Sequence, residues 1–204
     1  MNRFVICCLL CAAVLAPSAA ATAKQAFLKV SPLAGESKTS GSNDGKLLTG
    51  RSLNTRSRSS TKTITRNLRW KCEVRYRGED LPEKVEVRAF YIGCEADDNT
   101  PRILGQEVKN LTLDQGGKAS VELESPTVKL TKTRSASGTG ARSGRVAKTK
   151  STTSGQRMLG CVIQLFEEGE LVKSYSSVSQ WERAAREKDF SDASLTRKDG
   201  KRLN

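Results

Sequence analysis

The stretch of sequence that decides the fold is residues 62–77, which read KTITRNLRWKCEVRYR. In its second half the even positions are apolar, with Trp70, Cys72, Val74 and Tyr76, and every odd position is charged. Successive side chains of a strand point to opposite faces, so this alternation predicts a strand with one buried and one solvated face. The first half is basic and rich in Thr, and we hypothesise that it projects beyond the sheet.

Further apolar runs follow along the chain, separated by short turns. They cover residues 85–92, 103–113, 119–123, 128–130, 158–166 and 171–178. Together with the first run they make about seven strands, and no long helical period comes between them. We therefore predict a mostly β protein with an antiparallel β-sandwich domain over residues 61–190. Ser179 and Glu182 have the spacing of a capping box, which predicts one short C-terminal helix near residues 180–188.

The run Trp-x-Cys-x-Val-x-Tyr, at residues 70–76, resembles strand patterns of immunoglobulin-like and fibronectin type III domains of secreted bacterial proteins. The resemblance covers about residues 66–178 and consists of strand number and alternation. It departs from immunoglobulin spacing, because Trp70 precedes Cys72 by two residues instead of following it. The resemblance implies architecture only, since such domains serve many functions.

The first 23 residues have the pattern of a secretory signal peptide. Arg3 precedes the apolar run Phe4–Ala16, and small residues place cleavage after Ala21 or Ala23. The alternatives are a transmembrane helix, for which this run is too short, and a lipoprotein signal at Cys11, which its preceding leucines disfavour. We expect a secreted, periplasmic or cell-surface protein without a membrane span in the mature chain.

Removal of this peptide leaves three cysteines in an oxidising compartment, namely Cys72, Cys94 and Cys161. A hairpin with Tyr76 opposite Val85 would put Cys72 too far from Cys94 for a disulfide. We predict a Cys94–Cys161 disulfide if any forms; the alternative is that all three are small buried thiols.

Three segments have little apolar content. Residues 24–60 and residues 191–204 are predicted to be a disordered basic segment and a disordered tail. Residues 134–155 read RSASGTGARSGRVAKTKSTTSG and lie between two predicted strands. This pattern predicts one long basic β-hairpin arm with a flexible loop over residues 134–155.

The charge is concentrated in two blocks. The whole chain has 35 Lys and Arg against 22 Asp and Glu, a net charge of +13. Residues 45–72 and residues 125–166 each hold eight basic residues and no acidic one. Such blocks neutralise anionic polymers, although basic loops also serve solubility alone. The residues predicted to bind a polyanion are Arg56, Arg58, Lys62, Arg66, Arg134, Arg142, Arg145, Lys148 and Lys150.

The chain has no histidine, so histidine-based catalysis and histidine metal ligation are excluded. No other motif has the pattern of a catalytic, cofactor or metal site, and we predict a protein that is not an enzyme. The predicted function is a non-catalytic secreted or cell-envelope interaction or structural module, with an envelope or extracellular protein as partner. The alternative is a protein that binds an acidic glycan, lipopolysaccharide or extracellular nucleic acid through its two basic blocks.

Overall fold

A computed structural model describes residues 25–44, 55–78, 81–139 and 148–196. Ten strands lie in this part of the chain, and every pair of neighbouring strands is antiparallel. The strands are β1 (Gln25–Leu33), β2 (Ser37–Asp44), β3 (Thr55–Arg66), β4 (Arg69–Arg77), β5 (Lys84–Glu95), β6 (Arg102–Thr112), β7 (Lys118–Glu124), β8 (Val128–Thr139), β9 (Lys148–Glu167) and β10 (Glu170–Ser176).

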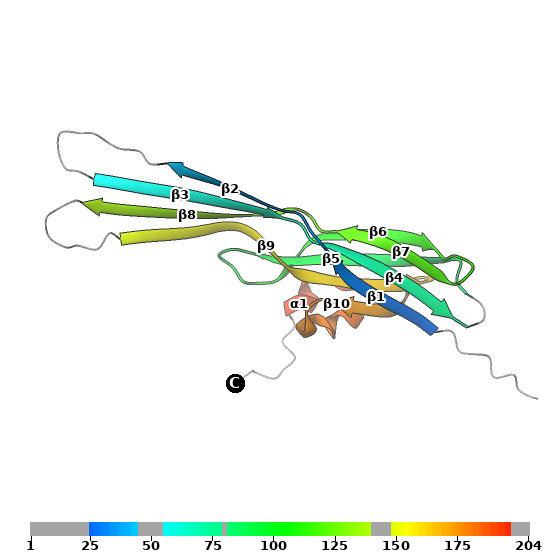
Figure 1. The fold of residues 1–204 in the computed structure, drawn as a ribbon. Helices are drawn as coiled ribbons and strands as arrows, with labels where there is room; N and C mark the ends of the chain where they lie inside the picture. Colours follow the sequence, from blue (N-terminus) through cyan, green and yellow to red (C-terminus); the bar gives the residue numbers. More distant parts are fainter. Residues whose placement is uncertain (1–24, 45–54, 79–80, 140–147, 197–204) are drawn as a thin grey trace, which may run out of the picture.

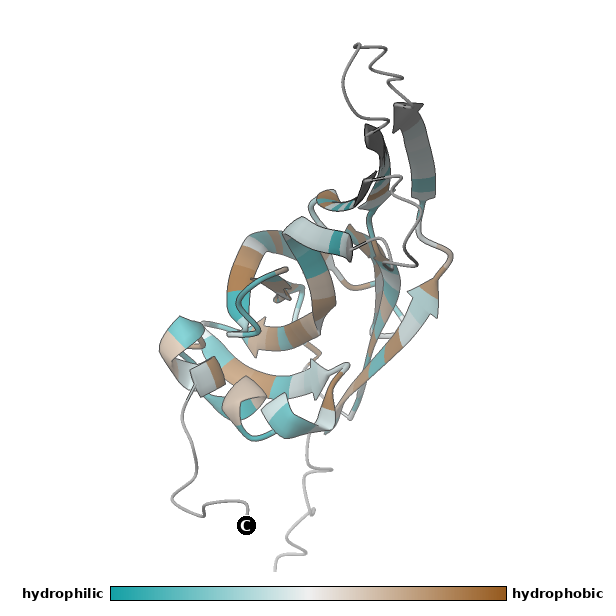
Figure 2. Cartoon of the chain, turned by 90° about the vertical axis from the view of Figure 1, so that its left-hand side faces the viewer, coloured by the Kyte–Doolittle hydropathy of each residue, from teal (hydrophilic) through white to brown (hydrophobic). Residues whose placement is uncertain are grey.

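The body of the molecule is a sandwich of two sheets, which confirms the predicted mostly β, antiparallel fold (Figure 1). One sheet has the order β1-β4-β7, and it packs on β5, β6, β9 and β10 of the larger sheet. The alternating apolar residues of β4 fill the space between the sheets, and the Trp70 ring stacks on Tyr91 of β5 at 5.8 Å. Hydrophobic residues are accordingly concentrated in the body (Figure 2).

Two predicted hairpins are not paired strands. The hairpin with Tyr76 opposite Val85 is wrong, because β4 pairs with β1 and β7, whereas β5 pairs with β6 and β9. The second is at residues 114–117, where the sequence Asp-Gln-Gly-Gly predicts a hairpin turn. The turn is present, but β6 before it and β7 after it belong to different sheets. Both connections therefore cross between the layers of the sandwich, as in many β-sandwich folds.

An arm of four strands, in the order β2-β3-β8-β9, extends from one end of the body (Figure 1). The predicted long hairpin is its β8–β9 half, which pairs Leu130–Ser137 with Lys148–Gly155. The predicted disordered segment over residues 24–60 is wrong for its described part, where β1, β2 and the start of β3 lie. The predicted loop over residues 134–155 is likewise strand up to Thr139 and from Lys148 on, and its tip lies outside the described residues.

The arm and the body are continuous, because β1–β2, β3–β4 and β7–β8 each run from one into the other. The buried residue Asn67 joins these three connections at the point where they pass from the arm to the body. Its Oδ1 accepts a hydrogen bond from the Glu36 N–H at 2.7 Å, and its Nδ2 donates to Glu124 at 2.5 Å. One side chain thus connects the β1–β2 bend and the end of β7 to the β3–β4 bend.

The C-terminal segment forms a third layer on the outer face of β5 and β9. It consists of two 3₁₀ turns, η1 (Ser179–Trp181) and η2 (Ala184–Arg186), and the short helix α1 (Asp192–Thr196). The predicted helix near residues 180–188 is therefore two 3₁₀ turns, and Ser179 begins η1 without a side-chain cap. Part of the predicted disordered tail over residues 191–204 is α1, and residues 197–204 lie outside the described part.

Gln164 holds this layer in place. It is fully buried on β9, and its Nε2 donates to the carbonyls of Ala185 at 2.9 Å and Glu187 at 2.7 Å. Trp181, Ala185 and Phe190 then pack on the outer apolar residues of the sheet. The segment therefore covers a face of the sheet.

Candidate functional site

The arm brings the two basic blocks of the sequence together. Strand β3 comes from the first block and β8 from the second, and they pair in register from Thr55↔Thr139 to Arg66↔Val128. In this register Lys62 lies directly opposite Lys132. Arg134 is two residues further along β8 and opposite Ser60, so its side chain is on the same face. We call the face that carries Arg66, Lys62, Lys132 and Arg134 the basic face; all four are exposed.

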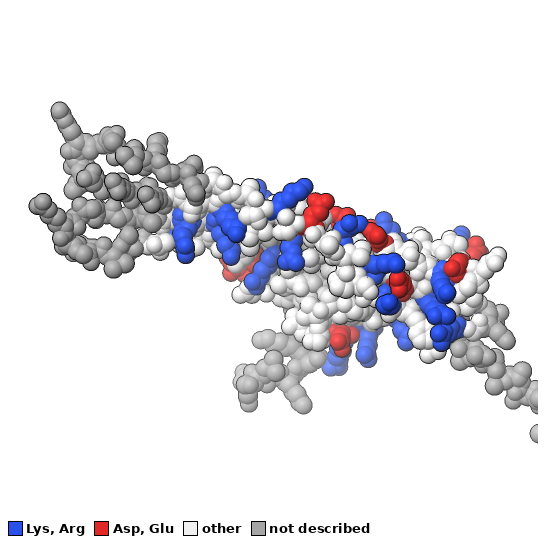
Figure 3. All heavy atoms as spheres, in the orientation of Figure 1, with Lys and Arg blue, Asp and Glu red and all other residues white. Residues whose placement is uncertain are grey.

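No acidic side chain balances this face within the described residues: Lys62, Lys132 and Arg134 take part in none of their ion pairs. Like charges directly opposite each other destabilise a sheet. In water, two unit charges ~6 Å apart repel by about 0.7 kcal/mol. Figure 3 shows basic side chains along the arm, whereas acidic ones are mixed with basic ones over the body.

The outer face of the body sheet shows the contrast. Lys71 lies 2.8 Å from Glu73, and Lys29 lies 3.6 Å from the same carboxylate. Arg69 pairs with Glu122 across the sheet at 2.5 Å. The Lys71 ammonium accordingly lowers the pKa of Glu73, and Glu73 raises the pKa of Lys71. Lys71, Lys29 and Arg69 of the body sheet are thus neutralised by carboxylates on the same face.

The other face of the arm is lined mainly by hydroxyl groups, and it also carries Lys38, Lys129 and Lys150. The register places Thr63 opposite Thr131, Thr61 opposite Thr133 and Ser59 opposite Ser135. The Oγ1 atoms of Thr63 and Thr131 lie 3.5 Å apart. We call this the hydroxyl face, and its threonines suit a pleated surface with β-branched neighbours.

The structure divides the predicted polyanion-binding residues. Lys62, Arg66 and Arg134 share the basic face, whereas Lys150 pairs with Ser135 and lies on the hydroxyl face. In the backbone register Arg56 is paired with Gly138, Arg58 with Ala136 and Lys148 with Ser137; Arg142 and Arg145 lie outside the described residues.

Lys132 was not among the predicted site residues, although it lies at the centre of the basic face. A signal for it exists in the sequence. It precedes Arg134 by two residues, and this spacing puts both side chains on one face once the strand that starts at residue 128 continues through them.

The predicted Cys94–Cys161 disulfide is wrong, because all three described cysteines are free and buried. Strands β5 and β9 are antiparallel neighbours, but Cys161 lies opposite Tyr91 and Cys94 lies opposite Arg157. The two cysteines are therefore offset by three residues, about 10 Å along the ladder, which is too far for a disulfide. Burial raises the pKa of Cys72 and of Cys161 to about 12, so neither is a ready nucleophile.

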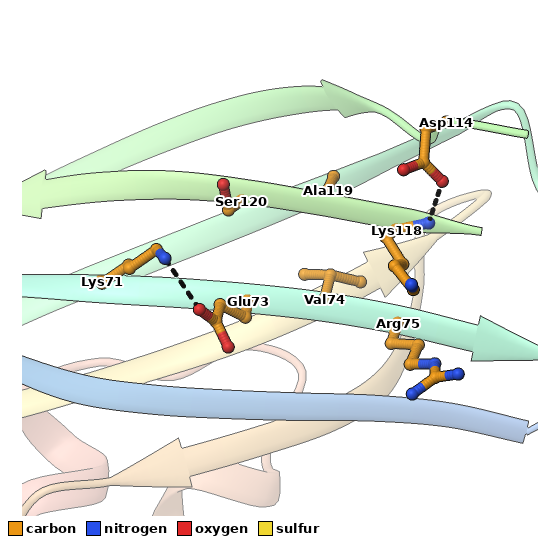
Figure 4. Close-up of a pocket in the computed structure, with 8 residues that line it drawn as sticks. All are labelled: Lys71, Glu73, Val74, Arg75, Asp114, Lys118, Ala119 and Ser120. Carbon is orange, nitrogen blue, oxygen red and sulfur yellow. Dashed lines mark hydrogen bonds and ion pairs between the residues drawn. The ribbon is translucent and has the colours of Figure 1, made fainter. Parts of the chain in front are cut away.

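A pocket of about 440 Å³ lies on the outer face of the three-stranded sheet, at the end of β4 and the start of β7 (Figure 4). Lys71 and Glu73 form the ion pair on one side of it. On the other side Arg75 lies opposite Lys118. The Asp114 carboxylate accepts the N–H groups of Gly116 and Lys118 at 2.8 Å each, which fixes the turn before β7.

In the part of the chain that the structure covers, no three metal-ligating side chains come together. No described helix has the length and apolar character needed to cross a membrane. No protein-family model and no curated protein matches the chain. The geometry of its own residues is therefore what supports a function.

Proposed function

We propose that this protein is a non-catalytic module that acts outside the cytoplasm and binds acidic polymers through the basic face of its arm. The observation that carries the proposal is the pairing of Lys62 with Lys132 beside Arg134, in the absence of a described partner carboxylate. An arrangement that costs energy in the free protein is stabilised when an anion lies over it.

The spacing on the basic face suits an extended ligand. Cationic side chains two residues apart on β8 repeat at about 6.8 Å, and neighbouring strands lie ~4.8 Å apart. Lys132 and Arg134 therefore present two charges in line, and Lys62 widens the row. Arg134 adds planar, bidentate pairing to a sulfate, phosphate or carboxylate. A linear polymer that lies along the strands contacts all three at once.

The described arm strands hold no aromatic residue, so the face lacks the side chains on which nucleic-acid bases stack. Recognition then depends on backbone charge and not on base identity. Acidic glycans, lipopolysaccharide and extracellular nucleic acid share this chemistry.

The test is retention of the mature chain on immobilised heparin, polyuronate and DNA in rising salt. We expect retention at ~0.15 M ionic strength, where charges further apart than ~8 Å are screened, and elution as salt rises. Absence of retention at this ionic strength on all three polymers would refute the proposal.

A second candidate function rests on the edges of the arm. In the described residues, β2 has a neighbour on one side only, and so does the arm part of β9. Open edges of this kind accept a strand from a partner protein. Binding to an envelope protein that persists at high salt, and that survives neutralisation of Lys62, Lys132 and Arg134, would favour this candidate.

A further inference from the structure

The end of the body opposite the arm carries a second pair of facing cations. Arg75 of β4 lies directly opposite Lys118 of β7, on the outer, solvated face of the three-stranded sheet. Phe27 of β1 completes this cross-strand row and is 37% exposed. Arg75 and Lys118 both line the open surface pocket of about 440 Å³ on this face.

The two described carboxylates that line the pocket with this pair have other partners. Glu73 receives both Lys71 and Lys29. Asp114 accepts two backbone N–H groups of its own turn. Arg75 and Lys118 form no ion pair within the described residues, so their charges face solvent and each other.

A third cation adds to the positive field. The Arg77 guanidinium lies over the Phe27 ring at 5.3 Å from its centroid. Phe27 is also the cross-strand neighbour of Arg75, so Arg77 and Arg75 flank one ring. Stacking on the ring limits the positions that the Arg77 side chain adopts.

Figure 4 shows the Arg75 and Lys118 side chains on the same side of the pocket, with Ser120 further along β7. We infer that Arg75 and Lys118 form a binding site for a phosphate or sulfate group. A sulfate or phosphate monoester group has three terminal oxygens, enough for a bidentate contact to Arg75 and a separate contact to Lys118. A carboxylate has two oxygens and one charge, and it satisfies this pair less well.

The site has a consequence that rests on the proposed function. The arm and the Arg75–Lys118 row lie at opposite ends of an elongated molecule (Figure 1). A protein with one anion site at each end can hold two polymer segments at once. We therefore expect it to bridge chains of a phosphorylated or sulfated polymer.

The site is tested first, with free inorganic phosphate and sulfate as probes. We expect saturable shifts of backbone amide NMR signals around Lys118 and Ser120 at low ionic strength in the mature chain. The double variant R75A/K118A should weaken binding at least tenfold, about 1.4 kcal/mol. The matched control K173A/R186A also removes two exposed positive charges, from β10 and η2, and should change the affinity less than twofold. The amide spectra of both variants show whether the fold is kept.

Two results would overturn the site: shifts that rise without saturation, or an equal loss of affinity in the control variant. Acetate serves as the carboxylate probe, and binding as tight as that of phosphate would overturn the preference for a phosphate or sulfate group over a carboxylate. Bridging is tested by light scattering with heparin, whose sulfate groups each have three terminal oxygens. R75A/K118A should abolish scattering while the arm still binds the polymer. Phosphate binding with no scattering by the wild type would refute bridging and leave the site intact. If phosphate binds at the Arg75–Lys118 site but the arm binds no polymer, the proposed function is refuted and the site is kept.

Discussion

Neutralising the basic face should reduce the salt dependence of polyanion binding by an amount that the structure sets. The variant K62Q/K132Q/R134Q removes the three facing cations and keeps side chains that fit a strand. A DNA duplex is the best calibrated probe, because each phosphate contact contributes about 0.9 to the slope of log K against log salt concentration. Three lost contacts therefore lower the slope by at most about 2.7.

This slope is large enough to measure. Between 50 and 200 mM salt it corresponds to a change in affinity of about 40-fold attributable to these three side chains. Fluorescence anisotropy with a labelled duplex, repeated over a series of salt concentrations, gives the slope directly. The triple variant K84Q/K173Q/R186Q is the control, since it removes three exposed cations from the body.

Stability distinguishes lost contacts from a damaged arm. Removal of Lys62–Lys132 repulsion should leave the free energy of unfolding equal to, or up to about 0.7 kcal/mol above, that of the wild type. Weaker binding together with unchanged or higher stability supports the basic face as the site. An equal decrease of slope in the control variant, or a wild-type slope near zero, would refute the reasoning.

Three further perturbations test the framework that positions the arm and the cores. N67A should lower the free energy of unfolding in urea by about 1–3 kcal/mol, because it leaves the Glu36 N–H without its acceptor, whereas N110A at an exposed position of β6 should have little effect. Q164A should lower the free energy of unfolding by a similar ~1–3 kcal/mol, because it leaves the carbonyls of Ala185 and Glu187 without their donor. It should also make the C-terminal layer more susceptible to proteolysis, and unchanged cleavage would contradict the role of Gln164 there. The free energy of unfolding should fall as pH rises from about 9 towards about 12, because the thiols of Cys72 and Cys161 ionise in the unfolded chain while they keep their protons in the folded protein. Each thiol should contribute a decrease of up to ~1.4 kcal/mol per pH unit. Urea midpoints at several pH values, in reductant, check this, and C72A should flatten the decline.

One glycine tests the bend between arm and body. A Cβ at Gly35 would lie 2.3 Å from the carbonyl oxygen of Asn67, which is backbone and cannot turn away. G35A should therefore cost about 1–3 kcal/mol, whereas G41A, where the nearest atom to a Cβ is at 3.5 Å, is the tolerant control. Equal urea midpoints for the two variants would show that the bend is not tightly packed.

Local alternation predicted the strands of the body well. The apolar residues of 70–76 and 158–166 are buried in β4 and β9, as predicted. Burial requires an apolar side chain at each inward position, so it leaves a pattern in the local sequence. Strands β1 and β2 were not predicted, because the local sequence does not show what holds them. β2 has no apolar alternation, and both strands are held by pairing with β4 and β3, which the composition of residues 24–60 does not show. Turn residues likewise predict that the chain reverses but not which sheet it enters, as at residues 114–117.

The sequence by itself determined that positive charge is gathered in two blocks without acids, because composition is a local property. Only the tertiary structure decided that the blocks pair, that Lys132 faces Lys62, and that Lys150 lies on the other side of the arm. Strands β3 and β8 meet across 68 residues of chain at Thr63 and Thr131. A shift of one residue in that pairing would exchange the basic and hydroxyl faces of β8 relative to β3, so the site depends on a register that long-range pairing alone sets.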